Sequence, residues 1–325
     1  MAKYDFSEVI DKIRTAERIA VFTHTMPDSD ALGSAFALRG ALRAMGKQAD
    51  CFLEKSLSAM YDFFPSDYVT EPEEVHKYDL KISVDCGERS RLGIFSDTFE
   101  GNTINMDHHR EKAAFAQTNI VDENSASTGE IIYELLLAAD AEITPEIADA
   151  LYAAVATDTG GFMFSNTTAN THRVAASLME AGADFYTLNK HLLLEKTLKK
   201  YRLTALCIEQ MEITQDGKIA VTALDYDTVK RLQVTADDLE GLSSLPRSIK
   251  GVEAGALLTE LEEGRIKVSL RSDRIVDVAK VAASFGGGGH MRASGFTGSG
   301  SIEELKRCIF QKLKAELDKV DGIVR

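Results

Sequence analysis

Cysteine is scarce in this chain, and its scarcity excludes two kinds of structural support. Only four cysteines occur among 325 residues, and they are scattered without a CxxC pair. A disulfide framework or a thiolate zinc site needs cysteines at characteristic spacings. The sequence therefore predicts a protein of a reducing compartment that has neither.

Long apolar runs and an excess of basic charge are also lacking. No stretch approaches the roughly 18 apolar residues of a membrane span, and the charged N-terminal segment has no apolar core of a secretion signal. The formal net charge of −14 opposes binding of long duplex DNA, which depends on neutralising phosphates. We therefore expect a cytoplasmic protein without membrane or long duplex DNA partners. A small phosphorylated ligand remains compatible with this charge.

Short β-rich runs alternate with helical patterns in the first half of the chain. The runs cover residues 18–24, 49–53, 79–84 and 103–106, and the first helical pattern covers 31–46. Such alternation predicts an α/β fold in which helices lie on both faces of a parallel sheet. We expect a doubly wound, mostly parallel sheet within a domain of residues 1–187.

The residue pattern and the expected secondary structure change after this domain. Residues 188–210 are charged, helical in pattern and free of turn signals, which predicts a helical linker. Short strand patterns with glycine-bearing turns follow, and a last amphipathic helix is expected at 302–317. Residues 211–325 are therefore predicted to form a smaller α+β domain.

Polar residues follow several of the predicted strands directly. His24, Asp85 and the cluster Asp107–His109 each come just after an apolar run. Ligands of open α/β sheets bind at the carboxyl ends of the strands. We therefore expect these side chains to lie near one another and to form a site.

Carboxylates and histidines at these positions suit a metal centre, although each has a structural alternative. His24, Asp28 and Asp30 lie within seven residues, but Asp30 could instead cap the next helix and Asp28 could form a turn. Asp85 and the paired histidines could likewise belong to turns. Asp158 ends a helix too apolar to be exposed, where an unpaired charge is rare.

The second half of the chain offers a candidate phosphate site. Gly286, Gly287, Gly288 and Gly289 precede His290, and glycines let backbone N–H groups approach a phosphate. Six lysines and arginines also lie between residues 265 and 292, opposed by two aspartates. The alternatives are a flexible loop and a solvated strand face.

Five segments together resemble a known family. HTMPDSDALGS, SVDCG, MDHHR and ATDTGGF resemble the four motifs of the DHH phosphoesterases, and GGGGHMRASGF resembles the glycine-rich signature of the DHH-associated substrate domain, DHHA1. The segments occur in the family's order and span nearly the whole chain.

The resemblance implies a role for each matching residue. Two divalent ions, Mn²⁺ first and Mg²⁺ or Co²⁺ as alternatives, would be held by His24, Asp28, Asp30, Asp85, His108 and Asp158, with Asp85 bridging. A hydroxide between the ions would attack phosphorus. His109 would contact the scissile phosphate, and Asp107 would orient His108. The nucleotide would be held by Arg271, Gly286–Gly289 and His290.

The two-domain size resembles the nanoRNase type within this family. That likeness implies hydrolysis of short oligoribonucleotides to mononucleotides, removal of the 3′-phosphate from pAp, and a homodimer. A phosphodiesterase acting on c-di-AMP or pApA would use the same residues. A non-catalytic nucleotide- or RNA-binding module is the alternative of another class, but it would not need six metal ligands.

Overall fold

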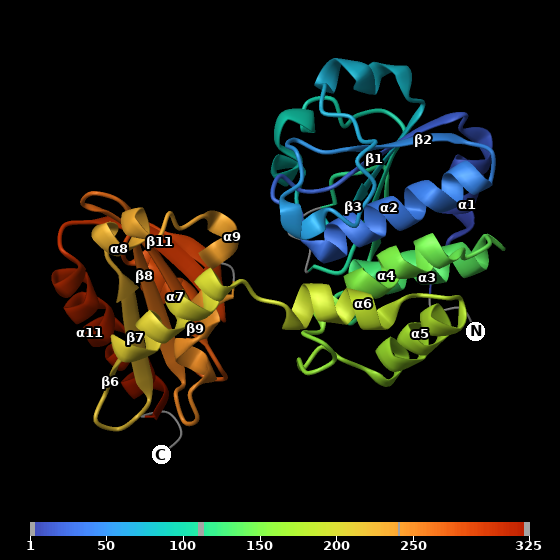
Figure 1. Cartoon of the computed structure of the whole chain (residues 1–325). Helices are drawn as coiled ribbons and strands as arrows, with labels where there is room; N and C mark the ends of the chain where they lie inside the picture. Colours follow the sequence, from blue (N-terminus) through green and yellow to red (C-terminus); the bar gives the residue numbers. More distant parts are fainter. Residues whose placement is uncertain (1–3, 110–113, 240, 322–325) are drawn as a thin grey trace. The chain divides into compact units, whose positions relative to one another are not determined.

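The chain folds into two compact units, and the first ends at Glu195 where the second begins at Lys196 (Figure 1). The computed structural model describes residues 4–109, 114–239 and 241–321. Arg110, the last residue of the MDHHR segment, lies outside these ranges.

The first unit is built on a five-stranded, wholly parallel sheet of order β2-β1-β3-β4-β5. Its strands are β1 (Arg18–Phe22), β2 (Gln48–Phe52), β3 (Leu80–Val84), β4 (Thr103–Asp107) and β5 (Thr118–Val121). The chain runs outward from β1 to β2 and then returns to β3 on the other side of β1. A crevice forms at such a reversal, beyond the carboxyl ends of the two central strands.

The two faces of this sheet are covered differently. Along β1, Ile19 and Val21 pack into the core shared with the α-helices, whereas Ala20 and Phe22 pack on the opposite side. Short 3₁₀ turns at Pro72–Lys77 and Arg89–Phe95 cover that opposite side. The helices are α1 (Ser7–Thr15), α2 (Ser29–Ala44), α3 (Thr128–Ala138), α4 (Pro145–Asp158), α5 (Ala169–Glu180) and α6 (Phe185–Asn189). The predicted doubly wound fold is confirmed, with 3₁₀ turns in place of α-helices on the second face.

Two glycines allow α2, α3 and α4 to approach closely (Figure 1). A Cβ on Gly33 of α2 would lie 2.2 Å from the carbonyl oxygen of Ala150, and one on Gly129 of α3 would lie 2.7 Å from the Cβ of Ala154. No side chain fits at such distances. This packing brings the start of α2, the start of α3 and the end of α4 to one place.

The predicted helical linker is divided between the two units. Helix α6 continues as a π-helix at Lys190–Leu194, and α7 begins only at Leu198 and ends at Glu209. Leu192 belongs to the core of the first unit, whereas Leu203 belongs to a core of the second. The segment is therefore helical, as predicted, but three irregular residues interrupt it and its halves pack on different units.

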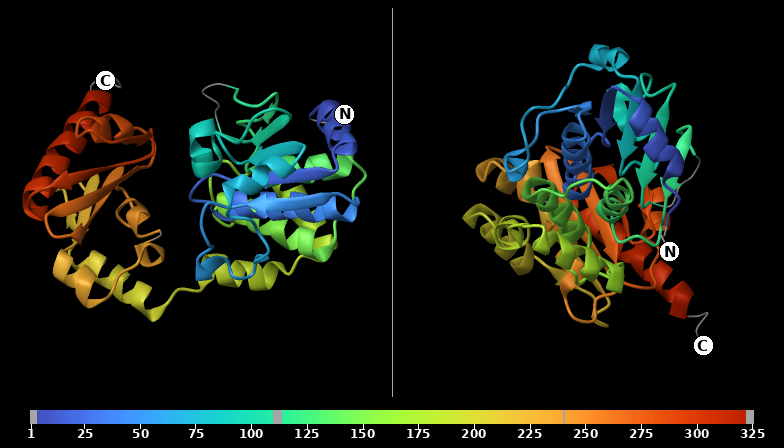
Figure 2. Two further views of the ribbon diagram at one scale, coloured as in Figure 1. Left: turned by 90° about the horizontal axis from the view of Figure 1, so that it is seen from above. Right: turned by 90° about the vertical axis from the view of Figure 1, so that its right-hand side faces the viewer.

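The second unit carries a mixed sheet of order β10-β11-β9-β8-β7-β6. The strands are β6 (Glu212–Ile213), β7 (Ile219–Leu224), β8 (Ala254–Glu262), β9 (Arg265–Ser272), β10 (Gly288–His290) and β11 (Ala293–Ser299). Helices α10 (Val278–Ala283) and α11 (Ile302–Asp321) pack on one face (Figure 2). Toward β7 and β8, the other face is covered by α7, α8 (Tyr226–Arg231), α9 (Ala236–Leu239) and turns.

Two expected absences can be compared with the described part of the chain. None of its helices combines the length and apolar character needed to cross a bilayer. All four cysteines are described and free; Cys308 is exposed and the other three are buried. These four cysteines form no disulfide with one another.

Candidate metal centre and phosphate-binding hollow

The polar residues predicted at strand ends converge beside the central strands of the first sheet. His24 follows β1 by two residues, Asp85 follows β3 directly, and Asp107 ends β4. His108 and His109 continue from Asp107. Because parallel strands end at one edge of the sheet, residues far apart in sequence meet here.

The start of α2 holds two aspartates in different ways. Oδ1 of Asp28 accepts hydrogen bonds from the backbone N–H groups of Asp30 and Ala31, each at 3.1 Å, so Asp28 is the N-cap. Asp30 is buried, and it accepts the N–H groups of Thr128 and Gly129 at 2.8 and 2.9 Å. The alternative in which Asp30 capped the helix is therefore wrong: Asp30 points at the N-terminus of α3.

Asp85 lies at the centre of the site in an unusual backbone conformation. Its φ is +55°, a value that aspartate, asparagine and glycine tolerate better than other residues. Oδ1 accepts a hydrogen bond from the hydroxyl of Thr128 at 3.0 Å, and Oδ2 lies 3.7 Å from Nε2 of His24. Burial would raise the pKa of Asp85, but the neighbouring histidines His109 and His24 outweigh it and lower that pKa.

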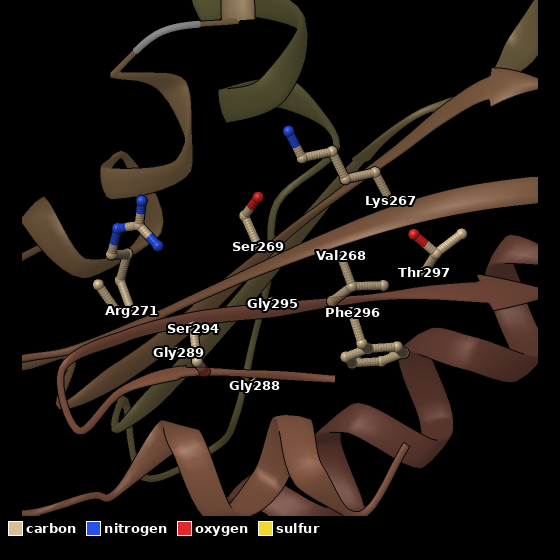
Figure 3. A pocket seen from close by; sticks show the side chains of 11 residues that line it. Lys267, Val268, Ser269, Arg271, Gly288, Gly289, Ser294, Gly295, Phe296 and Thr297 are labelled. Atoms are coloured by element: carbon tan, nitrogen blue, oxygen red, sulfur yellow. The ribbon is translucent and has the colours of Figure 1, made fainter. Parts of the chain in front are cut away.

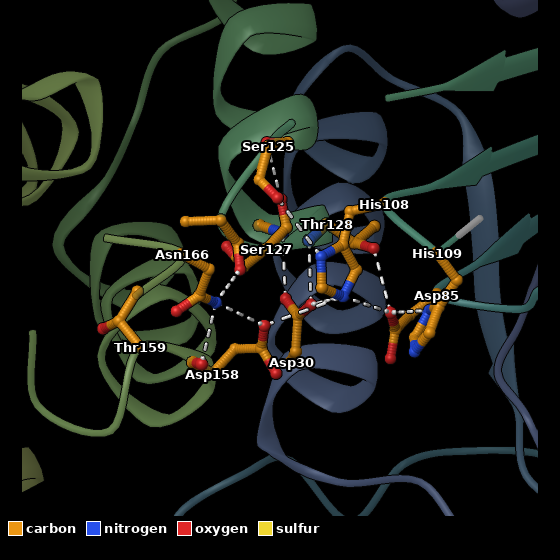
Figure 4. Close-up of polar contacts among 12 residues, drawn as sticks. Asp30, Asp85, His108, His109, Ser125, Ser127, Thr128, Asp158, Thr159 and Asn166 are labelled. Carbon is orange, nitrogen blue, oxygen red and sulfur yellow. Dashed lines mark hydrogen bonds and ion pairs between the residues drawn. The ribbon is translucent and has the colours of Figure 1, made fainter. Parts of the chain in front are cut away.

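His108 faces three carboxylates with one ring nitrogen (Figure 4). Nε2 lies 3.7 Å from Asp30, 3.6 Å from Asp85 and 3.7 Å from Asp158. Nδ1 lies 3.3 Å from the carbonyl oxygen of Ser125, to which it donates. That bond leaves Nε2 as an acceptor, which is the form that binds a metal.

Asp107 orients His109 rather than His108, which corrects the prediction. Oδ1 of Asp107 accepts from Nδ1 of His109 at 2.9 Å and from its backbone N–H at 3.1 Å. Adjacency in sequence does not fix which of two rings turns toward a carboxylate. Asp107 is fully buried and holds the pKa of His109 at about 10, with Asp85 contributing and burial opposing. The carboxylate of Asp107 therefore favours the protonated ring of His109.

Asp158 ends α4 and is held by Asn166. The side-chain amide of Asn166 donates to the carbonyl oxygen of Asp158 at 3.1 Å and reaches its Oδ2 at 3.4 Å. Burial raises the pKa of Asp158 to about 6, and repulsion by Asp85 adds to burial while His108 opposes it. Burial and the same crowding raise the pKa of Asp30 as well.

The donor set fits divalent cations. Three groups have ligand atoms that lie within 4.8 Å of one another: His24 with Asp28 and Asp85, Asp30 with His108 and Asp158, and Asp85 with His108 and His109. Spacings of 3.6 to 3.7 Å between imidazole and carboxylate are too long for direct hydrogen bonds. Ligands around one ion at about 2.1 Å lie roughly 3–4 Å apart. These acidic residues and histidines thus form a possible metal site of oxygen and imidazole donors.

The second unit presents a separate hollow on the open face of its sheet (Figure 3). Three of the residues predicted to bind phosphate, Arg271, Gly288 and Gly289, line it together with Lys267 and Ser269 of β9. Gly286, Gly287 and His290 are not among the lining residues. The glycine run is not a free loop, because Gly288–His290 pairs with β11 as an edge strand.

Sequence reasoning missed several partners of these residues. Thr128 donates to Asp85 and Asp30, Ser125 orients His108, and Asn166 holds Asp158. Only Thr128 could have been located from the sequence, because Ser127 and Glu130 form a helix-capping pattern that marks the start of α3. The contact of His108 with the backbone carbonyl of Ser125 could not be predicted, because every residue type has such a carbonyl.

Comparison with known proteins identifies the family of both units. Residues 18–155 match the DHH family, N-terminal domain, and residues 216–319 match the DHHA1 domain. The bifunctional oligoribonuclease and PAP phosphatase NrnA of Thermus thermophilus is 30% identical over 93% of this chain and 90% of its own length. The protein of the same name from Bacillus subtilis is 28% identical over 89% of this chain and 92% of its own.

A solved structure shares the fold of the whole chain. The exopolyphosphatase-related protein of Bacteroides fragilis superposes with a TM-score of 0.91 over 97% of both chains, at 24% sequence identity. At that identity the likeness concerns the fold alone. With both family domains matched in order and a relative of 30% identity aligned over nine-tenths of its length, the chain belongs to the DHH family of phosphoesterases.

Proposed function

We propose that this chain hydrolyses short oligoribonucleotides to mononucleotides and removes the 3′-phosphate from pAp. The observation that carries the proposal is the meeting of two histidines and four aspartates at the end of one sheet: His24, Asp28, Asp30, Asp85, His108 and Asp158. The names of the full-length relatives from Thermus thermophilus and Bacillus subtilis support this choice over a cyclic-dinucleotide phosphodiesterase or a binding module.

Two divalent ions are part of the proposal. His24, Asp28 and Asp85 would hold one ion, and Asp30, Asp85, His108 and Asp158 the other. Mn²⁺ suits this mixture of carboxylate and imidazole best, with Mg²⁺ or Co²⁺ as alternatives. When bound, such ions lower the pKa of water and neutralise charge on a phosphoryl group.

His109 would supply the positive side chain nearest the reacting phosphate. It is 35% exposed, whereas Asp107 behind it is fully buried. The hydrogen bond from Nδ1 to Asp107 leaves Nε2 free to donate to a phosphate oxygen. A charged donor held in place stabilises the negative charge that develops during attack on phosphorus.

The second unit would bind a phosphate of the nucleotide. Arg271 and the backbone of Gly288 and Gly289 share one hollow, where they offer a guanidinium and close backbone approach. We retain His290, Gly286 and Gly287 as proposed contributors, because His290 lies exposed on the same edge strand.

Side-by-side assays with Mn²⁺ test the proposal. Release of phosphate and AMP from pAp, and of mononucleotides from RNA of a few residues, should exceed the rate on c-di-AMP. No release from either preferred substrate would refute the hydrolase, and saturable nucleotide binding without turnover would favour a binding module.

Asp85→Asn provides the matched variant for these assays. The substitution keeps the backbone conformation but removes a charge shared by the two proposed ions, so kcat should fall by about a thousandfold or more. Asp140→Asn is the control, since Asp140 is exposed and has nearly the same φ of +54°. Equal activity of Asp85→Asn and the wild type would contradict the proposed site.

A further inference from the structure

Strand β9 presents alternate residues to two different environments. Ile266, Val268 and Leu270 are buried in the core beneath α10 and α11. Lys267, Ser269 and Arg271 point to the opposite side, where the hollow lies (Figure 3). One strand therefore supports the fold with one face and offers a polar, basic row with the other.

Half of the basic side chains along this segment are neutralised by carboxylates. Arg265 pairs with Glu262, Arg274 with Asp273, and Lys280 with Asp277. Lys267, Arg271 and Arg292 form no ion pair with a carboxylate of the described residues, and Arg271 and Arg292 donate instead to backbone carbonyl oxygens. Lys267 and Arg271 line the hollow, which points to an anionic ligand.

Another cation without a carboxylate partner among the described residues lies on the same face as Arg271, and a glycine makes room for it. Gly255 of β8 is the register partner of Arg271 on β9, so a side chain there would project from the same face. A Cβ on Gly255 would lie 2.5 Å from the Cβ of Pro246 and 3.2 Å from the backbone nitrogen of Arg247. The absence of that side chain lets the turn Pro246–Ser248 lie against the sheet beside Arg271.

Arg247 on this turn is half-buried and has no hydrogen bond or ion pair with the rest of the described chain. Burial lowers the pKa of Arg271, and the charge of Arg247 lowers it further. The backbone of Arg247 lies against Gly255, the register partner of Arg271, so both arginines belong to one part of this sheet face. No acidic partner among the described residues offsets their repulsion, and a shared anion would do so. The arrangement is thus suited to a ligand with more than one negative charge.

We propose that Arg247 and Arg271 together bind a terminal phosphate monoester, so that Arg247 determines specificity for substrates that end in a free phosphate. The inference rests on the proposed function and adds a selectivity to it. A phosphate monoester carries about 1.5 to 2 negative charges at neutral pH, whereas an internal diester carries a single one. Two forked guanidiniums match the charge and the oxygens of the monoester better than those of the diester.

The test compares pApA with ApA, which share the bond to be cleaved and differ in the 5′-phosphate. The full-length protein with Mn²⁺ should prefer pApA. Arg247→Gln should lower kcat/KM for pApA by about ten- to a hundredfold, the effect of losing a charge-assisted hydrogen bond, and should leave ApA nearly unchanged. Equal use of both dinucleotides by the wild type, or an equal loss on both in the variant, would overturn the inference.

Two controls separate recognition from folding. Lys280→Gln removes a cation from α10, on the opposite face of the same sheet, and should leave the pApA/ApA ratio unaltered. Arg247→Lys keeps the charge without the fork and should restore part of that ratio. Absence of hydrolysis of pAp, short RNA and both dinucleotides would instead refute the proposed function itself.

A binding measurement tests the same point without turnover. AMP and its 5′-methyl ester differ by the second negative charge on the phosphate. In competition assays the wild type should bind AMP more tightly than the ester, and Arg247→Gln should bind the two equally. A variant that keeps the wild-type preference for AMP would contradict a role for Arg247 in charge selection.

Discussion

At the scale of single residues, the crowding of carboxylates around His108 has a cost in the absence of metal. Asp158 titrates with a pKa of about 6 in the folded chain, against an ordinary value of 3.8. Between these pH values the folded chain holds a proton that the unfolded chain has released. The free energy of unfolding must therefore fall as the pH rises from about 4 to 6, and it stays lower above that range.

Asp158→Asn should consequently stabilise the metal-free protein at pH 7.5. The amide keeps the size of the side chain and removes the charge, so a gain of roughly 2–3 kcal/mol is the upper expectation. Urea unfolding in a chelator measures it, and the gain should vanish at pH 4. With Mn²⁺ the order should reverse, because the wild type gains binding energy that the variant lacks. A variant less stable than the wild type in chelator at pH 7.5 would contradict this account.

Residue types and strand ends were enough to predict which side chains converge, but not how each is held. His24, Asp85 and His108 could be placed because apolar runs precede them. The choice between Asp28 and Asp30 as the helix cap depended on where α2 begins, and sequence locates helix ends only within a residue or two. The ring that Asp107 contacts depends on side-chain rotation, which no spacing reveals.

At the scale of elements, neighbouring glycines at the edge strand β10 have different roles, one in packing and one in the proposed binding site. A Cβ on Gly287 would lie 2.3 Å from the carbonyl oxygen of Gly295, whereas one on Gly288 meets nothing within 4 Å. Gly288 nevertheless lines the hollow, as Arg271 does. The two glycines therefore have different reasons to lack a side chain.

Alanine substitutions should reveal this difference. Gly288→Ala should unfold within about 0.5 kcal/mol of the wild type and raise KM for pAp about tenfold, because a methyl group enters the hollow. Gly287→Ala should lower the melting temperature clearly, since the backbone must move. Thermal melts and steady-state kinetics on both variants measure the two effects. A Gly288→Ala protein with unchanged KM would remove this strand from the substrate site.

Elements with strong apolar patterns were predictable, and weakly patterned ones were not. Strands β1, β3 and β4 and helix α2 begin and end within two residues of their predicted ranges. Strand β11 has the sequence ASGFTGS, which is poor in β-forming residues. It is a strand because it pairs with β9 along seven positions, a long-range contact that local propensity does not record.

At the scale of the whole molecule, the chain has separate hydrophobic cores. The clusters around Ile19 and Phe22 belong to the first unit, and those around Val268 and Leu203 belong to the second. Residues Glu195–Thr197 carry the chain between the units without regular structure. Units with their own cores are expected to unfold separately.

Ligands should therefore shift two different unfolding transitions. Calorimetry on the full chain should show that Mn²⁺ raises the transition of the first unit and that AMP raises that of the second, because each ligand stabilises the unit that binds it. Limited proteolysis near Glu195–Thr197 followed by calorimetry of the fragments assigns the transitions. A single transition that both ligands shift equally would contradict independent units.

The hydrogen bonds that hold the proposed ligands have a consequence for ion exchange. Asp28 is fixed by the start of α2, Asp30 by the start of α3, and His108 by the carbonyl of Ser125. These side chains are ordered by the protein itself, so they lose little rotamer freedom when an ion binds. Binding then loses little conformational entropy, and one ion can replace another without rearrangement of the chain. Selectivity among metals then depends on how well the radius and preferred coordination of each ion match a fixed set of donors.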